Sequence, residues 1–185
     1  MKLRTIGLFL LATVSLLALT VSVQADDKKN QFFGSHSDVS FAGDLWASLE
    51  KNRLVGKNSI NVYPFNGNQP HGAIQQVLDT EISVKGRAAR VIVKRNHGGK
   101  NATVKSVYSD PTSYLKAITV MFKRETGYDS ENLDWFWAKF TPSGKLAKNP
   151  KGTPLAGQIA KETTVGCIAC HKAIGGADLE TLTEK

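Results

Sequence analysis

After the apolar N-terminal segment, hydrophobic residues first recur with a helical period between residues 40 and 54. They are spaced three and four residues apart, at Phe41, Leu45, Trp46 and Leu49. This pattern predicts an amphipathic helix over residues 40–54, capped by Ser40 and ended by Gly56. The preceding residues 32–38 are mixed in composition and contain Gly and Ser, which predicts a flexible lead.

Beyond residue 72 the pattern becomes strand-like. Residues 73–84 and 87–94 are rich in β-branched side chains, and the turn at Lys85 and Gly86 between them predicts a β-hairpin. Further elements are expected in this order: a turn at 96–99, a strand at 103–108, a helical turn after Pro111, strands at 118–122 and 133–140, and helices at 155–161 and 167–174. The predicted fold is α+β, an antiparallel sheet of four to five strands with an N-terminal helix and C-terminal helices.

The first 25 residues have the pattern of a targeting segment. Lys2 and Arg4 precede an almost wholly apolar run over residues 6–21, and small residues stand at Val23 and Ala25. This predicts a cleaved signal peptide and one exported domain of residues 26–185, placed in the periplasm. An uncleaved membrane anchor is the alternative. No second apolar span follows, so no stable membrane insertion is expected after cleavage.

The net charge of the chain and its distribution limit the classes of binding partner that are expected. The formal net charge is +8, or +6 without the two cations of the predicted signal peptide. Lys and Arg are spread along the chain without a block or an aromatic-basic stripe, which argues against nucleic-acid binding. The pattern favours a solvated basic surface, and a surface that steers an acidic redox partner is the alternative.

The candidate chemistry lies near the C-terminus, in the sequence Gly166-Cys-Ile-Ala-Cys-His171, which also holds the chain's two cysteines. In a Cys-x-x-Cys-His motif, the thiols of Cys167 and Cys170 add across the two vinyl groups of a haem, and His171 supplies an axial iron ligand. An exported chain whose cysteines are all in this motif is typical of a c-type cytochrome with one covalently bound haem c.

Three other interpretations of the cysteines fit the sequence less well. A thioredoxin-like redox pair needs a larger βαβ unit than the fourteen residues after the motif allow. A zinc site needs more ligands than the spacing indicates. A plain disulfide would close only a very small loop and stabilise little.

The position of the motif limits the sixth iron ligand. No methionine follows His171, and Met121 alternates with apolar neighbours on a predicted strand, which favours a core role. His36, His71 and His97 are all in predicted loops and stay open as distal ligands. We expect an iron ligated by His171 with an open or weakly held opposite side, as in haem proteins that bind small molecules.

Several stretches, in this order, resemble the cytochrome P-460 family, which includes the cytochromes c-prime-beta. They are Pro64-Phe65, Pro70-His-Gly72, Asp134-Trp-Phe-Trp-Ala-Lys139 and Cys167 to His171. The resemblance covers about residues 41–176 and implies one of two activities. Some members oxidise hydroxylamine with a haem cross-linked to a lysine shortly after the Pro-x-Gly turn; others bind nitric oxide or carbon monoxide in an apolar pocket without the cross-link.

In this chain Val77 occupies the expected lysine position, and the nearest lysine downstream is Lys85 in a predicted turn. The sequence therefore favours an exported cytochrome that binds a small diatomic or nitrogenous ligand such as nitric oxide, with electron transfer to a redox partner protein as an added role. A hydroxylamine- or nitric oxide-oxidising enzyme and a passive six-coordinate electron-transfer cytochrome are the alternatives. Cavity-lining candidates are Phe65, Val77, Phe122, Trp135 and Trp137.

The enzyme alternative also needs a general base near the iron. Four carboxylates between the last two predicted strands are the candidates, although a solvated acidic turn is the simpler interpretation: Glu125, Asp129, Glu131 and Asp134. An exposed sheet edge would let two subunits pair, so a homodimer stays open.

Overall fold

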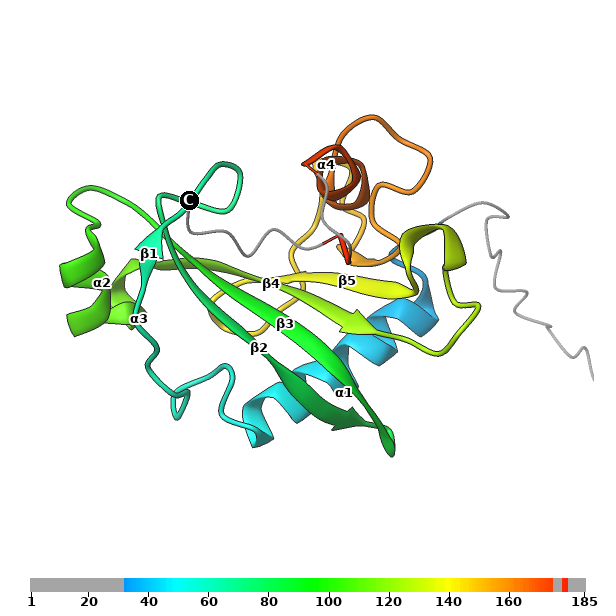
Figure 1. The fold of residues 1–185 in the computed structure, drawn as a ribbon, viewed down its shortest axis with the longest axis horizontal. Helices are drawn as coiled ribbons and strands as arrows, with labels where there is room; N and C mark the ends of the chain where they lie inside the picture. Colours follow the sequence, from blue (N-terminus) through cyan, green and yellow to red (C-terminus); the bar gives the residue numbers. More distant parts are fainter. Residues whose placement is uncertain (1–31, 175–177, 180–185) are drawn as a thin grey trace, which may run out of the picture.

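The computed structural model describes residues 32–174 and 178–179, so the predicted signal peptide is outside the described residues. An antiparallel sheet of six strands in the order β1-β2-β3-β4-β5-β6 forms its centre (Figure 1). The strands are β1 Phe65–Asn66, β2 Ile74–Val84, β3 Arg87–His97, β4 Leu115–Lys123, β5 Trp135–Phe140 and β6 Ala156–Gly157. The helical elements are α1 His36–Lys51, α2 Val104–Ser109, α3 Pro111–Tyr114, the 3-10 turn η1 Ser130–Asn132 and α4 Cys167–Ile174. The α+β class is confirmed, and the two-residue edge strands β1 and β6 bring the sheet to six.

The first helix begins earlier than predicted. Ser35 caps α1 by accepting a hydrogen bond from the Asp38 amide at 3.1 Å, and the Ser35 amide donates back to the Asp38 carboxylate at 3.1 Å. This capping box places residues 36–39 in the helix, so the Ser40 cap and the flexible lead were wrong. The helix ends at Lys51, with Asn52 as its C-cap, rather than at Gly56.

Two other segments differ in type from the prediction. Residues 103–108 belong mostly to α2, because Thr103 and Ser106 form a second capping box that starts a helix instead of a strand. Residues 155–161 contain strand β6, whose Gly157 pairs with Trp137 of β5 at a positive φ of 115°. The predicted turn at 96–99 begins only at Gly98, because β3 extends through His97.

One face of the sheet forms the main hydrophobic core. A row of aligned residues crosses four strands on this face: Leu78, Val93, Val120 and Ala138. Helix α1 covers the row with Leu45 and Leu49, both fully buried. Figure 1 shows α1 running along one side of the sheet and α4 on the other.

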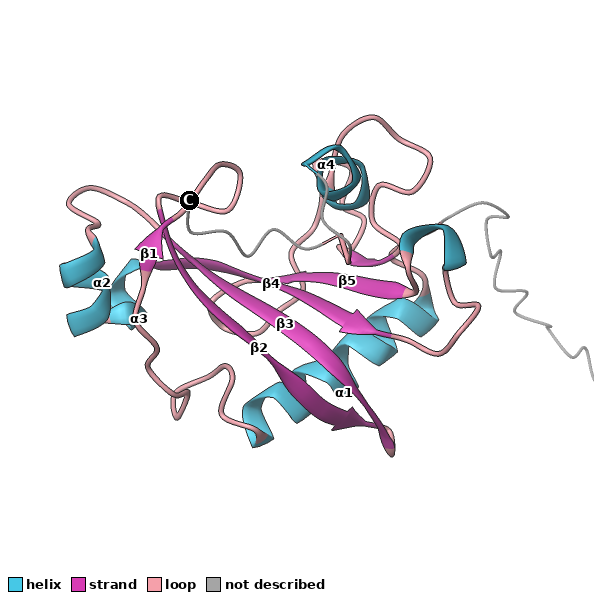
Figure 2. Ribbon diagram, in the orientation of Figure 1, coloured by secondary structure: helices cyan, strands magenta, loops and turns pink. Residues whose placement is uncertain are grey.

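The opposite face is mixed in polarity and only partly covered. One row crosses it as Val77, Lys94, Thr119 and Lys139; the next row crosses it as Asp79, Ile92, Met121 and Trp137. The short helix α4 and the loops around it lie over the second row (Figure 2). Strand alternation thus directs apolar residues to α1 and places lysine and threonine on the face near α4.

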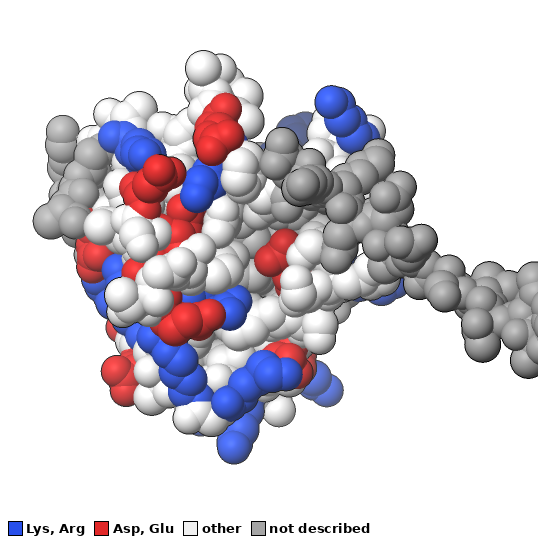
Figure 3. Space-filling model, turned by 90° about the vertical axis from the view of Figure 1, so that its right-hand side faces the viewer, with Lys and Arg blue, Asp and Glu red and all other residues white. Residues whose placement is uncertain are grey.

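The surface carries charges of both signs. Figure 3 shows basic and acidic side chains intermixed on the end of the molecule that it presents. Several are paired, including Lys85 with Asp44 at 3.2 Å. Within residues 32–174 and 178–179, no helix is long and apolar enough to cross a membrane.

Candidate functional site

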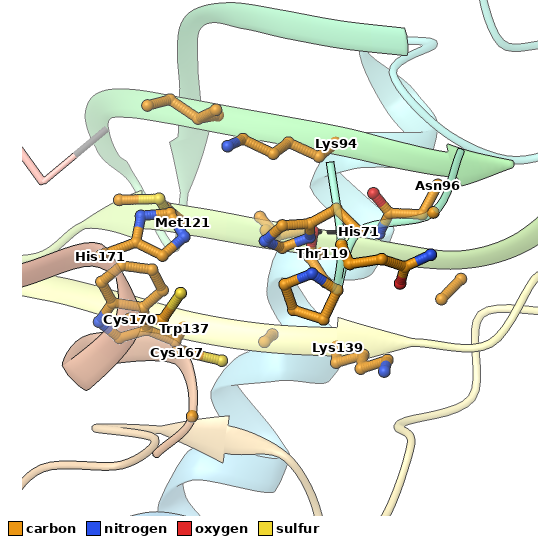
Figure 4. Close-up of a pocket in the computed structure, with 18 of the residues that line it drawn as sticks. His71, Lys94, Asn96, Thr119, Met121, Trp137, Lys139, Cys167, Cys170 and His171 are labelled. Atoms are coloured by element: carbon orange, nitrogen blue, oxygen red, sulfur yellow. Dashed lines mark hydrogen bonds between the residues drawn. The ribbon is translucent and has the colours of Figure 1, made fainter. Parts of the chain in front are cut away.

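A cavity of about 710 Å³ lies between α4, the loop that precedes β2 and the mixed face of the sheet (Figure 4). Its apolar lining includes Ile92, Met121 and Trp137, all close to α4. Its polar lining includes His71, Lys94, Asn96, Thr119 and Lys139. The volume is within the range of pockets that bury a cofactor-sized ligand.

Helix α4 brings the whole Cys-x-x-Cys-His motif to this cavity. Cys167, Cys170 and His171 all line it, since residues three and four apart share one face of a helix. Ile168 anchors the helix in a small apolar cluster with Ile92 and Trp137. Gly166 precedes the helix at a φ of 116°, where a Cβ atom would approach the Ala160 Cβ to 2.5 Å. Glycine is therefore required at this close approach.

Both cysteines are free thiols in the structure. Burial raises the pKa of Cys167 to about 11, so its thiol is protonated at neutral pH. A thiol used in disulfide exchange has a lowered pKa instead. The environment of Cys167 therefore differs from that of a thioredoxin-like redox pair.

His171 is held in one orientation with one ring nitrogen committed. It is 4% exposed, and its Nδ1 is hydrogen-bonded to the backbone carbonyl of Leu179. Because a carbonyl only accepts, Nδ1 must carry the proton, and Nε2 then has the free lone pair that a metal ligand needs. Burial also lowers the pKa of His171, which favours this neutral form.

The segment that supplies the Leu179 carbonyl is tied to the sheet by its neighbour Asp178. Asp178 forms ion pairs with Arg90 and Lys123, and its backbone carbonyl accepts a hydrogen bond from the Trp135 indole at 2.9 Å. Three strands thus fix the partner of His171 Nδ1. Such a partner orients a metal-binding histidine and sets its tautomer.

The wall facing α4 presents a second histidine. His71 Nδ1 is 3.3 Å from the Thr119 hydroxyl, which accepts a hydrogen bond from Asn96 Nδ2 at 3.2 Å. Burial, and secondarily the charge of Lys94, lowers the pKa of His71 to about 4. His71 is therefore a neutral imidazole at physiological pH.

Three buried polar atoms beside the cavity lack a partner. Asn96 Oδ1, His97 Nδ1 and Trp137 Nε1 make no hydrogen bond within the part of the chain that the structure describes. All three residues line the cavity. Buried polar groups are normally satisfied, so these atoms leave hydrogen-bonding capacity beside the cavity.

The five cavity candidates from the sequence have different positions. Trp137 lines the cavity, and its ring centre is 4.8 Å from that of His171. Val77 and Trp135 pack in the apolar cluster beneath α4 without lining the cavity. Phe65 is in β1, outside the lining. Phe122 is on the opposite face against Phe41, because its position in β4 has the parity of Val120 rather than that of Met121.

Lys94 is one of several cavity residues that were not singled out from the sequence. It is 3% exposed, lines the cavity, and aligns directly with Val77 on the neighbouring strand. The sequence did contain a signal. Val91 and Val93 are two residues apart and share the core face of the strand, so Lys94 is predicted on the opposite face. Recognising it also required the register of the hairpin.

The four candidate carboxylates lie outside the cavity lining. Glu125 pairs with Arg124, and Glu131 is 75% exposed. Asp129 is buried against Lys161 and Asn132, and Asp134 accepts a hydrogen bond from the Asp129 amide. They form a local turn network and do not reach the cavity.

Of the three histidines expected in loops, only His71 is in one. His36 is the first residue of α1 and is exposed. His97 is fully buried at the end of β3, with Nε2 3.1 Å from Gln76 Oε1.

The residues at the cavity fit a covalently attached haem. They supply two free thiols and an imidazole with a free Nε2 on one face of α4, beside a large cavity with an apolar side and unpartnered polar atoms. Within the described ranges, no group of three His, Cys, Asp or Glu side chains is arranged to hold a metal ion.

Comparison with known proteins adds no relative. The chain matches no protein-family model, no curated protein and no solved structure. A function for this site therefore has to be argued from its own residues.

Proposed function

We propose that this chain is an exported c-type cytochrome, similar to the cytochrome P-460 family, that carries one haem c and binds a small ligand such as nitric oxide. The observation that carries the proposal is the state of His171. It is buried, its Nδ1 is committed to the Leu179 carbonyl, and it lines the cavity beside both thiols. Cys167 and Cys170 would hold the haem, and His171 Nε2 would ligate the iron.

A bound haem supplies an iron centre that binds diatomic molecules and exchanges electrons. The chain's own residues set the conditions around it. Asp178 and Leu179 fix the direction of His171, while Ile92, Met121 and Trp137 exclude water on the side near α4. The side away from α4 is polar, which departs from the apolar pocket that the resemblance implies.

Oxidation of hydroxylamine is the second candidate, and the specific observation in its favour is Lys94. The resemblance implies a lysine bonded to the haem, and Lys94 stands beside the Val77 position, buried in the cavity wall. A ferrous band that is red-shifted, survives denaturation and disappears in Lys94→Met would support this enzyme. Lys139→Met, which removes the other lysine of the same row, is the matched control.

Electron transfer to a redox partner protein is compatible with either candidate. The net charge, +6 once the predicted signal peptide is removed, would favour an acidic partner through electrostatic steering. Export to the periplasm and pairing of subunits into a homodimer complete the proposal. Size-exclusion chromatography with light scattering of the exported protein tests the last point.

The ferrous absorption spectrum, recorded with and without carbon monoxide, tests the proposed function. The expected result is a covalently attached haem whose spectrum shifts when carbon monoxide is added. A haem spectrum that carbon monoxide leaves unchanged would contradict ligand binding. His171→Ala should keep the covalent haem but alter its ligation, and His36→Ala is the control at an exposed histidine.

A further inference from the structure

Two imidazoles face each other across the cavity. His171 enters from α4 and His71 from the loop between β1 and β2, and their ring centres are 6.0 Å apart with planes at 89° (Figure 4). Two segments that are 100 positions apart in the sequence therefore present the same metal-binding group to one space. Histidine is the commonest metal ligand among the side chains.

Each imidazole has its Nδ1 engaged in a hydrogen bond. His171 Nδ1 is hydrogen-bonded to the Leu179 carbonyl and His71 Nδ1 to the Thr119 hydroxyl. The Nε2 atoms remain for a ligand in the cavity. Histidines that bind metals in proteins almost always have their second nitrogen held in this way.

The separation of the rings matches that of two ligands on one metal ion. A metal–imidazole bond is about 2 Å long, so two nitrogens on opposite sides of a metal are about 4 Å apart. Each ring centre is about 1 Å behind its nitrogen, which gives a centre-to-centre distance of about 6 Å. The observed 6.0 Å agrees with this distance.

We propose that His71 is the second axial ligand of the haem iron in the resting protein. The inference rests on the proposed function, because it requires haem attached at Cys167 and Cys170 and ligated by His171. It also deepens that function, since a small ligand reaches the iron only by displacing His71. Competition from His71 thus sets the apparent affinity of the iron for the small ligand.

The surroundings of His71 are built to hold it. The Thr119 hydroxyl oxygen accepts a hydrogen bond from Asn96 and can also accept one from His71 Nδ1–H, which leaves the lone pair of Nε2 free for a metal. Gly72 has a φ of 93°, and a Cβ atom there would approach the His97 carbonyl oxygen to 2.6 Å. The loop therefore runs close against β3, and this contact fixes the backbone position of His71.

Met121 is the rival ligand in the cavity. It aligns with Trp137 on the floor of the cavity, and the Trp137 ring is packed against His171. Met121 thus lies beside His171, whereas His71 faces it from across the space (Figure 4). A trans pair of ligands requires the second arrangement.

The test compares the full-length protein with His71→Ala, made in cells that attach haem c. We expect a low-spin spectrum for the wild type in both oxidation states and a high-spin spectrum for His71→Ala. Added imidazole should restore the low-spin spectrum of His71→Ala, which a merely structural role of His71 would not produce. The apparent affinity for carbon monoxide should rise about tenfold or more in the variant, since the competing ligand is gone.

Three further variants complete the design. Thr119→Val keeps His71 but removes its hydrogen-bond partner, and should raise the carbon monoxide affinity by a smaller factor; it serves if His71→Ala fails to fold. Met121→Leu removes the rival ligand and should still give a low-spin iron, and His36→Ala is the control at an exposed histidine. A high-spin wild type, or a low-spin spectrum that survives His71→Ala, would overturn the inference while covalent haem and carbon monoxide binding still upheld the proposed function. A wild type without covalent haem would instead remove the proposed function itself.

Discussion

The two faces of the sheet are built from the same strands for opposite purposes. The face under α1 holds eighteen buried hydrophobic residues in one cluster, closed by Leu45 and Leu49 of the helix. The face near α4 has a buried hydrophobic cluster of seven residues and a cavity of about 710 Å³. Stability is concentrated on the first face because buried apolar area is largest there. The second face can therefore keep a cavity and polar side chains that a sealed core would not tolerate.

Because the hydrophobic cluster on the α4 face is small, polar contacts have to hold the site in place. The α4 face gains rigidity from directed contacts, such as Asp178 with Arg90 and Lys123, rather than from close packing of a large core. Ion pairs and hydrogen bonds orient side chains without filling the cavity, whereas apolar packing would fill it. The division predicts that changes on the two faces affect different measurements.

The largest expected effect on stability is on the α1 face. Phe136 is fully buried and packs edge-on against Phe41 at 4.8 Å. Phe136→Ala should lower the free energy of unfolding by about 4 kcal/mol, measured by urea unfolding, because it leaves a large cavity. The haem spectrum of the folded variant should stay that of the wild type. An altered spectrum at unchanged stability would break the division between the faces.

A smaller loss is expected from the buried ion pair of the acidic turn. Asp129 has a fully buried side chain that accepts hydrogen bonds from Lys161 and Asn132, both at 2.8 Å. Asp129→Asn should cost about 2 kcal/mol of unfolding free energy, since Lys161 loses its partner in a partly buried place. Carbon monoxide binding should not change. If Asp129→Asn lost carbon monoxide binding but kept the wild-type unfolding free energy, Asp129 would act in the site rather than in the turn.

His97 should make stability depend on pH. Burial lowers its pKa from 6.5 to about 4, so the folded state favours the neutral ring. The stability linked to this ring is complete above pH 6.5 and is lost as the pH falls towards 4. Between pH 7.5 and 5, we expect the wild type to lose about 2 kcal/mol more than His97→Gln. Equal losses in the two proteins would exclude this contribution.

The smallest expected effect is at the exposed hairpin turn between β2 and β3. Lys85 and Gly86 both have positive φ, 51° and 81°, which is the type of turn that prefers Asn-Gly. Lys85→Asn should raise the unfolding free energy by about 0.5 kcal/mol, because the exposed ion pair with Asp44 contributes little. Thermal melting measures the gain, with Asp44→Asn as the control. A marked loss of stability in Lys85→Asn would mean that the ion pair outweighs the turn.

Much of this architecture follows from the sequence. The hairpin of β2 and β3, the strand β4 and helix α4 were predicted, since β-branched alternation and the spacing of the motif are local signals. The start of α1 was missed although its signal was local too, in Ser35 and Asp38, the residues of the capping box. The strand predicted at 103–108 failed for the same reason, because a capping box outweighed the β propensity of its residues.

The site was less predictable than the fold. Cys167, Cys170 and His171 stand in one motif, whereas Lys94 and His71 reach the cavity only through sheet register and the course of a loop. The alignment of Lys94 with Val77 is a property of strand pairing that one sequence does not contain. The role of Asp178 and Leu179 depends on contacts of Asp178 with three strands that are distant in the sequence. Contacts between distant segments therefore decided the parts of the site that were missed.

The most direct test of the central proposal is the intact mass of the exported protein, together with haem staining after denaturing electrophoresis. In cells that attach haem c, the wild type should gain the mass of one haem and keep its stain, while Cys167→Ala combined with Cys170→Ala should show neither. A wild-type chain of unmodified mass that does not stain, made beside a control cytochrome that matures normally, would contradict the account.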